Sequence, residues 1–312
     1  MTFQDLNSLG KQRKPFLFIT DFKAQNIEII LLDELEKNDI EFAIDENYIK
    51  KNHTQTLEKE PLSFEIYYKK FKKVIDKIKA GESYLLNLTQ ETKIKSSLSL
   101  KEIYQNANAH YKLRYKDKFV CFSPEKFIQI SENKIHTYPM KGTIDASLQN
   151  AKEKILADTK EMAEHIMVVD LLRNDLSIVA KNVTVEDFRY ITTVDTGEKK
   201  LLQVSSHISG TLEYNWHSHI GTILSSLLPA GSITGTPKKS TVKIIEDIEE
   251  YERGYFSGVF GIYDGKKLDS GVMIRFIEKI EDGYIYKSGG GITLDSDANS
   301  EYNELLDKIY LP

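Results

Sequence analysis

Hydrophobic and polar positions along the chain predict a mixture of helices and strands. Apolar residues recur at spacings of three and four over 63–79, which predicts an amphipathic helix that ends at Gly81. A second long helix is predicted over 159–179. The turns Tyr263-Asp-Gly-Lys and Glu281-Asp-Gly separate apolar runs and predict β-hairpins. Further strands are expected at 16–20, 27–32, 84–89, 118–122, 127–130, 258–263, 271–277 and 284–287, and further helices at 98–109, after Pro237 and from Ser300.

The order of these elements indicates the fold class and the organisation of the chain. Strands and helices follow one another without a regular βαβ alternation, and the hairpin turns favour antiparallel pairing. We therefore predict an α+β fold built on mainly antiparallel sheets. Residues 1–60 are expected to be a short segment that contributes to a sheet and ends in a lysine-rich linker over 48–59, and residues 61–312 to form one compact unit.

The composition narrows the class of protein. No run approaches the roughly 18 consecutive apolar residues that a membrane span requires, and the N-terminus lacks the pattern of a secretory signal. We therefore expect a cytoplasmic protein that does not act in a membrane. The net charge of −5 argues against a nucleic-acid binder, because such proteins neutralise phosphates with a basic face. The single cysteine, Cys121, excludes an internal disulfide and a cysteine metal cluster.

Two of the predicted helices each contain a pair of glutamates three residues apart. Such a pair shares one face of its helix, and two facing pairs would offer oxygen ligands suited to Mg²⁺. These glutamates could instead have a structural role. Glu161 has the spacing of a capping-box partner for Asp158, and Glu304 has the spacing of an ion-pair partner for Lys308. The pairs are Glu161 with Glu164, and Glu301 with Glu304.

Other candidate residues are cationic or lie in glycine-rich loops. Arg275 lies in the apolar run Val272-Met-Ile-Arg-Phe-Ile, where it needs an anionic partner, either a substrate carboxylate or a structural salt bridge. The loops 231–238 and 288–291 could present backbone amides to an anion or could be tight turns. Lys141 follows Pro139 and precedes a glycine, and it is either a solvated surface lysine or a buried nucleophile.

Longer motifs extend from about Phe64 to the C-terminus. They are Gly81-Glu-Ser-Tyr-Leu-Leu-Asn-Leu-Thr-Gln90, Ser123-Pro-Glu125, Pro139-Met-Lys-Gly-Thr143, Ala163-Glu-His-Ile-Met-Val-Val-Asp-Leu-Leu-Arg-Asn-Asp175, Pro229-Ala-Gly-Ser-Ile-Thr-Gly-Thr-Pro-Lys238, Arg253-Gly254 and the stretch 289–308. In this order they resemble the motifs of the chorismate-utilising enzymes, which include the anthranilate, aminodeoxychorismate, isochorismate and salicylate synthases. The resemblance implies an anthranilate-synthase-like fold, with two packed, mainly antiparallel sheets, helices outside them and the active site between them.

The same resemblance implies roles for individual residues. Glu164 and Glu304 correspond to direct Mg²⁺ ligands, and Glu161 and Glu301 to carboxylates that hold the metal through water. Glu125 corresponds to the general acid that protonates the departing C4 hydroxyl of chorismate. The remaining correspondences are His207 beside the reacting ring, Thr143 as a substrate-binding residue, and Arg275, the amides of Gly290 and Gly291, and Lys308 around the enolpyruvyl carboxylate.

Two positions discriminate between the reactions of this family. Lys141 stands where enzymes resembling aminodeoxychorismate synthase have a lysine whose amine is thought to attack C2 before ammonia enters at C4. Leu85 aligns with the lysine that activates water in isochorismate and salicylate synthases, and leucine cannot act as a base. The resemblance therefore implies amination at C4, with ammonia from a separate glutamine amidotransferase subunit. Anthranilate synthase component I and a non-catalytic chorismate-binding protein stay open as alternatives.

Overall fold

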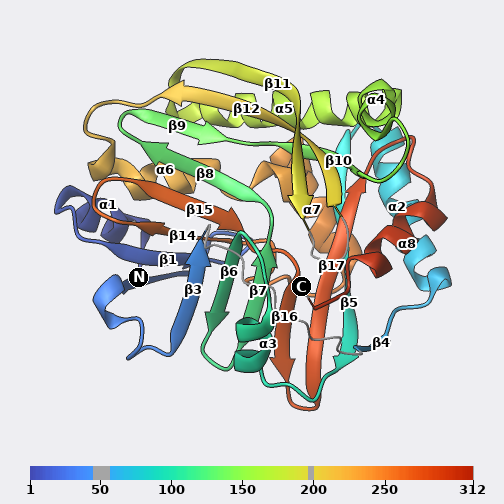
Figure 1. Ribbon diagram of the computed structural model, residues 1–312, viewed down its shortest axis with the longest axis horizontal. Helices are drawn as coiled ribbons and strands as arrows, with labels where there is room; N and C mark the ends of the chain where they lie inside the picture. Colours follow the sequence, from blue (N-terminus) through green and yellow to red (C-terminus); the bar gives the residue numbers. More distant parts are fainter. Residues whose placement is uncertain (45–56, 196–199, 312) are drawn as a thin grey trace.

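The computed structural model describes residues 1–44, 57–195 and 200–311. Within these residues the strands form two sheets, and every strand pairing is antiparallel (Figure 1). The nine-stranded sheet has the order β10-β12-β9-β8-β15-β14-β1-β2, with β11 paired to β12. Its strands are β1 (Phe16–Thr20), β2 (Ile27–Leu31), β8 (Lys126–Ser131), β9 (Lys134–Thr137), β10 (Met140–Asp145), β11 (Lys181–Asp195), β12 (Lys200–Thr211), β14 (Val259–Tyr263) and β15 (Leu268–Val272).

The eight-stranded sheet has the order β13-β5-β17-β16-β7-β6-β3, with β4 paired to β5. Its strands are β3 (Ile40–Ile44), β4 (Glu58–Glu60), β5 (Leu85–Lys95), β6 (Tyr111–Tyr115), β7 (Phe119–Ser123), β13 (Gly235–Thr236), β16 (Phe276–Ile280) and β17 (Gly283–Ile292). The predicted α+β class and the mainly antiparallel sheets are confirmed.

The helices lie around the two sheets (Figure 1). Helix α5 packs against β10, β11 and β12, whereas α2 and α8 pack against each other and against β17. The α-helices are α1 (Phe3–Lys11), α2 (Phe64–Lys79), α3 (Leu100–Asn106), α4 (Ala151–Ala157), α5 (Thr159–Val179), α6 (Ile220–Leu227), α7 (Lys238–Glu249) and α8 (Ala298–Asp307), and the 3-10 helices are η1 (Leu32–Glu34), η2 (Trp216–His219) and η3 (Gly231–Ile233).

Elements with strong local signals match the sequence predictions. Helix α5 has the predicted bounds, and the side chain of Asp158 caps it by accepting a hydrogen bond from Glu161 N at 2.9 Å. Helix α2 ends at Lys79, and Gly81 follows it with a φ of +76°, a conformation that glycine adopts at little cost. The β14–β15 and β16–β17 hairpins are also confirmed.

One predicted strand is wrong in a way that affects the candidate site. The apolar run 271–277 is not a single strand, because β15 ends at Val272 and β16 begins at Phe276. The two strands belong to different sheets, so the chain crosses from one sheet to the other within this run. Arg275 lies in the crossing with a φ of +50° and is only partly buried. The hydrophobic pattern could not show this break, since both sides of it are apolar.

The N-terminal segment contributes strands to both sheets. Strands β1 and β2 lie at one end of the nine-stranded sheet, and β3 is the end strand of the other. Most of the predicted linker, 48–56, lies outside the described residues. Its last residues form a strand instead, since β4 pairs with Lys93–Lys95 of β5. None of the described helices is both long enough and apolar enough to span a membrane.

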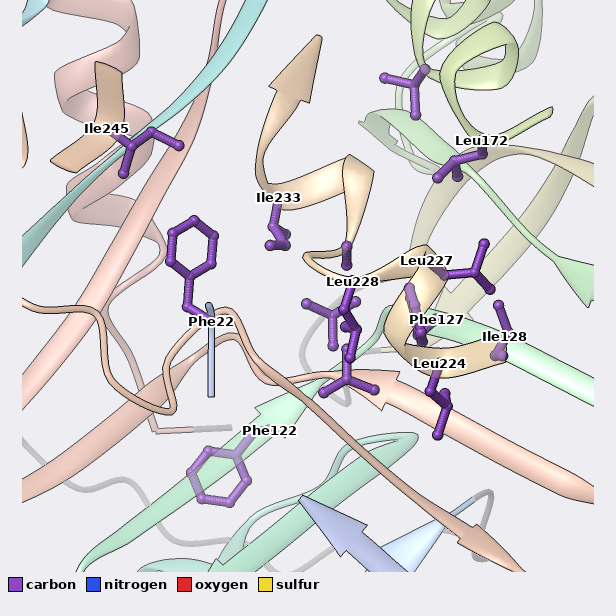
Figure 2. Close-up of a cluster of buried hydrophobic side chains, with 14 of the residues drawn as sticks. Phe22, Phe122, Phe127, Ile128, Leu172, Leu224, Leu227, Leu228, Ile233 and Ile245 are labelled. Atoms are coloured by element: carbon purple, nitrogen blue, oxygen red, sulfur yellow. The ribbon is translucent and has the colours of Figure 1, made fainter. Parts of the chain in front are cut away.

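A large hydrophobic cluster holds the elements together. Figure 2 shows aliphatic side chains of α5, α6 and β8 directed toward one another, with Phe22 and Phe122 nearby. Leu224 is fully buried, and Leu172 and Leu227 are at most 8% exposed. Because each such side chain contributes about 1.5–3 kcal/mol when it is removed from water, this cluster fixes α5 against the nine-stranded sheet. The first turns of α5 are therefore held over β10.

Candidate active site

Helix α5 and strand β10 bring Lys141 and Glu164 together. Lys141 Nζ lies 2.6 Å from Oε2 of Glu164, whose side chain is 6% exposed. Lys160, one turn earlier on α5, lies 3.9 Å from the other carboxylate oxygen. Burial by itself would lower the pKa of Lys141, but the carboxylates of Glu164, Glu161 and Glu304 outweigh it and raise the pKa. The raised pKa keeps Lys141 in its ammonium form rather than as a free amine.

The other three predicted metal ligands surround this ion pair. Glu161 Oε2 is buried and has no hydrogen-bond partner among the described residues, and burial raises the pKa of this carboxyl. Burial also raises the pKa of Glu301, although Ser296 donates a hydrogen bond to it at 2.8 Å. For Glu304 burial acts in the same direction, but Lys308, Lys141 and Lys160 together outweigh it and lower the pKa. The two helices therefore direct their carboxylates at one region.

These carboxylates fit a hard cation in their chemistry. All four offer oxygen atoms, and the orphaned Oε2 of Glu161 has a lone pair available. The described residues contain no group of three or more histidine, cysteine or carboxylate side chains already close enough to hold a metal ion. The positive charge beside Glu164 is instead the ammonium group of Lys141. A divalent ion here would therefore compete with Lys141 for the same carboxylate.

The glycine-rich end of β17 lies directly beside α8. A Cβ atom on Gly290 would come within 3.5–3.7 Å of Glu301 Oε2, Glu304 Oε1 and Lys308 Nζ. Lys308 Nζ also donates to the carbonyl oxygen of Gly289 at 2.8 Å and pairs with Glu304 at 2.7 Å. The missing side chain of Gly290 thus leaves open space among two carboxylates and an ammonium group.

The strand register shows which glycine amide faces this space. Asn87 lies opposite Gly291, and its N–H donates to Thr234 O on the far side of β5. Since antiparallel pairs alternate between bonded and non-bonded partners, the N–H of Gly291 points away from β5, toward the edge where Lys308 contacts Gly289. Strand β16 pairs with β17 only as far as Lys287, so none of the described strands covers this edge. By the same alternation, the N–H of Gly290 faces β5.

Arg275 lies at the start of this uncovered edge. Phe276 pairs with Lys287, which places Arg275 next to Ser288. Its guanidinium group lies 5.1 Å from the ring centre of Tyr310, in a cation–π contact. Arg275 is therefore not enclosed within a strand as predicted, and it lies on the side of β17 where Lys308 contacts Gly289.

Glu125 approaches the same region from the turn between β7 and β8. Ser232 Oγ donates a hydrogen bond to Glu125 Oε1, and Glu125 N donates to Ser123 Oγ at 3.0 Å. Burial raises the pKa of the Glu125 carboxyl, although the Ser232 hydrogen bond and the charge of Lys308 act against it. A raised pKa favours the protonated form that a general acid requires.

The described contacts do not connect His207 to this cluster. His207 Nε2 lies 3.0 Å from His136 Nδ1, and its ring stacks on Tyr138 with centroids 4.8 Å apart. The preceding residue, Ser206, points to the opposite face of β12 and is hydrogen-bonded to His165 of α5 at 2.7 Å. Because successive side chains of a strand alternate between faces, the face toward α5 presents Ser206 rather than His207.

Two other residues singled out from the sequence are Thr143, which is exposed, and Leu85, which is buried. Thr143 lies on β10 opposite Gln203, and its side chain is exposed. Leu85 is 5% exposed at the start of β5, and its Cδ1 lies 3.2 Å from where a Cβ on Gly291 would be. Leu85 is therefore an apolar neighbour of Gly291 and cannot act as a base.

Two polar residues for which no role was predicted also lie in this region. Ser232 lies inside the loop 231–238, which was noted only for its backbone amides, and the structure shows its hydroxyl on Glu125. His165 is fully buried beside Glu164 on α5. Its position next to a candidate ligand was the one local signal available.

Comparison with known proteins decides the family. The family model described as "chorismate binding enzyme" matches residues 15–311. The chain belongs to the family of chorismate-binding enzymes.

Relatives of this chorismate-binding enzyme include proteins of similar length and longer ones. An "uncharacterized PabA-like protein" of Haemophilus influenzae is 48% identical over 316 residues, which cover 99% of this chain and 95% of that protein. Aminodeoxychorismate synthase component 1 of Salmonella typhimurium is 29% identical and matches 78% of this chain and 56% of its own length. The menaquinone-specific isochorismate synthase MenF of Escherichia coli has the same fold, with a TM-score of 0.74 and 16% identity over 97% of this chain and 79% of MenF. The resemblance inferred from the sequence motifs and the anthranilate-synthase-like fold are thereby confirmed.

Proposed function

We propose that this chorismate-binding enzyme converts chorismate and ammonia to 4-amino-4-deoxychorismate, as component I of an aminodeoxychorismate synthase. The observation that supports it best is the position of Lys141, whose Nζ lies 2.6 Å from Glu164 among the four candidate metal carboxylates. The synthase named for this reaction in Salmonella typhimurium is a relative and is designated component 1. A separate glutamine amidotransferase subunit would supply the ammonia.

The proposed reaction has two steps, and each uses residues of the described cluster. The neutral amine of Lys141 attacks C2 of chorismate, the ring double bonds shift, and the C4–O bond breaks as Glu125 protonates the leaving hydroxyl to release water. Ammonia then forms a bond to C4, the double bonds shift back, and the bond between C2 and Lys141 breaks to restore the neutral amine. The new C4 ammonium group gives up one proton, which returns to Glu125. Because Lys141 is paired with Glu164, it must lose a proton before it can attack.

The carboxylates of α5 and α8 would hold Mg²⁺ in this proposal. Glu164 and Glu304 would be its direct ligands, and Glu161 and Glu301 would hold it through water. When bound, the ion would neutralise one carboxylate of chorismate and orient its ring. The orphaned Oε2 of Glu161 and the all-oxygen donor set support this assignment.

The groups around β17 would hold the second carboxylate of chorismate. The amide of Gly291, the guanidinium group of Arg275 and Lys308 Nζ all lie at the uncovered edge of this strand. An anion there would receive hydrogen bonds from donors that are already positioned. Leu85, packed next to Gly291, cannot itself act as the base that activates water, which argues against isochorismate formation.

Product analysis tests this function. Purified protein would be incubated with chorismate, Mg²⁺ and excess ammonium at mildly alkaline pH, with and without aminodeoxychorismate lyase. We expect para-aminobenzoate only when the lyase is present. Anthranilate as the product would show amination at C2 and overturn the proposal. If no product formed, even after addition of an amidotransferase subunit and glutamine, the chain would instead be a chorismate-binding protein without this activity.

A further inference from the structure

Arg253 and Glu249 form a buried ion pair that the proposed chemistry does not use. Their side chains are 2% and 1% exposed. Arg253 Nε donates to Glu249 Oε2 at 2.8 Å, and Arg253 Nη2 lies 2.7 Å from Glu249 Oε1. Removal of two charges from water is costly, so a pair of this kind needs further hydrogen bonds to be retained. The Arg253-Gly254 motif is one of those that resemble the family's motifs, but the resemblance implied no role for these two residues.

The remaining hydrogen bonds of this pair reach two separate backbone segments. Arg253 Nη1 donates to the carbonyl oxygen of Ile233 at 3.1 Å, and Nη2 donates to that of Asn87 at 2.8 Å. Glu249 Oε1 accepts from Thr89 N at 2.8 Å and from Thr89 Oγ1 at 2.7 Å. The ion pair therefore fastens the loop 231–236 and strand β5 to the end of α7.

Both of these backbone segments adjoin residues of the candidate active site. Ile233 follows Ser232, whose hydroxyl group donates to Glu125. Asn87 lies opposite Gly291, whose amide faces the uncovered edge of β17. A shift of the Ile233 carbonyl would move the adjacent Ser232, because the two residues share the single turn of η3.

We propose that Arg253 is a positioning residue, which holds the Ile233 carbonyl and thereby keeps the Ser232 hydroxyl on Glu125. The planar guanidinium group makes this possible, since its donors have fixed directions and reach Glu249, Ile233 and Asn87 together. A lysine has the same charge but a single nitrogen, so it cannot reproduce this set of bonds. The inference depends on the proposed function only for the reaction used as one of its readouts.

The test compares Arg253→Lys, which conserves the charge of the buried pair, with a matched control elsewhere in the fold. Arg114 is also a buried arginine, with a side chain 6% exposed, and it pairs with Asp39 at 2.7 Å and Glu41 at 2.7 Å. It lies on β6, and its described bonds reach Asp39, Glu41 and Lys116, none of which is among the residues of the candidate active site. Arg114→Lys should therefore lower the melting temperature without altering Glu125.

The first readout is the titration of Glu125 in protein with ¹³C-labelled glutamate carboxyls, with the resonance assigned through Glu125→Gln. The charge of Lys308, which is the same in all the variants, and the hydrogen bond from Ser232 both act to lower the pKa of Glu125. Ser232→Ala should therefore raise the pKa of Glu125. Arg253→Lys, which keeps the positive charge, should raise it in the same direction and should have no further effect when combined with Ser232→Ala.

The second readout is turnover of chorismate, whichever product is formed. Arg253→Lys should lower kcat by about tenfold or more while KM for chorismate changes by less than about threefold, as expected for a group that aligns a catalytic acid. The inference is overturned if Arg253→Lys behaves like Arg114→Lys, with a lower melting temperature and an unchanged Glu125, or if its effect adds to that of Ser232→Ala. A wild-type protein without any turnover would contradict the proposed function, and the titration would still decide the role of Arg253.

Discussion

Lys141 Nζ lies 2.6 Å from Glu164 Oε2, so the proposed nucleophile and a proposed metal ligand form one ion pair. The carboxylate stabilises the protonated lysine and raises its pKa. A nucleophilic role requires the opposite, a neutral amine. Occupation of Glu164 by Mg²⁺ would remove this stabilisation, and the metal and the nucleophile are therefore expected to depend on each other.

Replacement of Lys141 tests its role in turnover. Lys141→Ala should lower kcat by at least about 100-fold, because the covalent step is lost while the acid and the binding groups stay in place. A chorismate adduct on Lys141 should be detected by intact mass analysis of the wild-type protein and be absent from the variant. Lys181→Ala, which removes a surface lysine paired with Glu213, is the control and should retain activity. Persistent turnover in Lys141→Ala would exclude an obligatory covalent route.

Metal binding can be measured without substrate. Titration with MgCl₂ should give heat by calorimetry and raise the melting temperature, and Glu164→Gln or Glu304→Gln should weaken this binding by about tenfold or more. The control is Glu213→Gln, since Glu213 is an exposed glutamate whose partner is Lys181. Unchanged Mg²⁺ affinity in both ligand variants would contradict the assignment of the site.

The pH dependence of turnover reports on Glu125. Burial raises the pKa of this carboxyl, and the proposed acid must be protonated to act. Loss of the Glu125 proton should therefore lower the rate as the pH increases through its raised pKa, whereas deprotonation of Lys141, whose pKa is also raised, should raise the rate with pH. Glu125→Gln should remove this part of the profile and lower kcat by about 100-fold or more. A profile that kept the same fall in Glu125→Gln would assign it to another group.

His217 should make the fold less stable in acid. Its Nδ1 is hydrogen-bonded to Tyr263 Oη at 2.6 Å, and burial followed by the charge of Arg13 lowers the pKa of His217 to about 4. The unfolded chain binds this proton near the ordinary value of about 6.5, so between these values it binds more protons than the folded protein. Stability is therefore complete above about pH 6.5 and decreases as the pH falls toward 4.

The effect of His217 is measured by comparing the free energy of unfolding of the wild-type protein with that of a variant without this histidine. Denaturant unfolding of wild-type protein and His217→Gln at pH 7 and pH 5 should show a smaller loss of stability in the variant. His165, with its pKa also lowered to about 4 mainly by burial, contributes in the same direction in both proteins and cancels in the comparison. Equal losses would show that His217 is not the group responsible.

Leu85 can be tested as a determinant of the reaction. Leu85→Lys places an amine next to Gly291 in a position that is 5% exposed, where burial would favour its neutral form. We expect the variant to form isochorismate from chorismate and Mg²⁺ and to lose part of its amination activity. Leu85→Met is the control, since it keeps an apolar side chain of similar volume. A Leu85→Lys protein that is folded and forms no isochorismate would remove Leu85 from the account of specificity.

Local signals in the sequence were sufficient for many elements but not for their contacts. The bounds of α5 follow from its apolar spacing and the Asp158 cap. The break at Arg275 could not be predicted, because it depends on which sheet each strand joins. His207 illustrates the same limit, since a period of two shows that neighbours alternate and does not show which face meets α5.

The prediction that these residues form one site came from the resemblance to a known family, because the pattern of residues along the chain did not group them. Lys141 and the glutamates of α5 and α8 were singled out separately, and nothing local predicted that Lys141 would pair with Glu164. Ser232 and Glu125 are 107 residues apart in the chain, and their hydrogen bond follows only from the packing of the loop after α6. Contacts of this kind result from the tertiary fold, to which a single sequence gives no direct access.

The position of the new nitrogen on the ring distinguishes amination at C4 from amination at C2. The protein would be incubated with chorismate, Mg²⁺ and ¹⁵N-labelled ammonium, and the product would be examined by ¹H–¹⁵N correlation NMR before any lyase is added. We expect ¹⁵N bonded to C4, with the enolpyruvyl group retained. Nitrogen at C2, or anthranilate with loss of pyruvate, would contradict it.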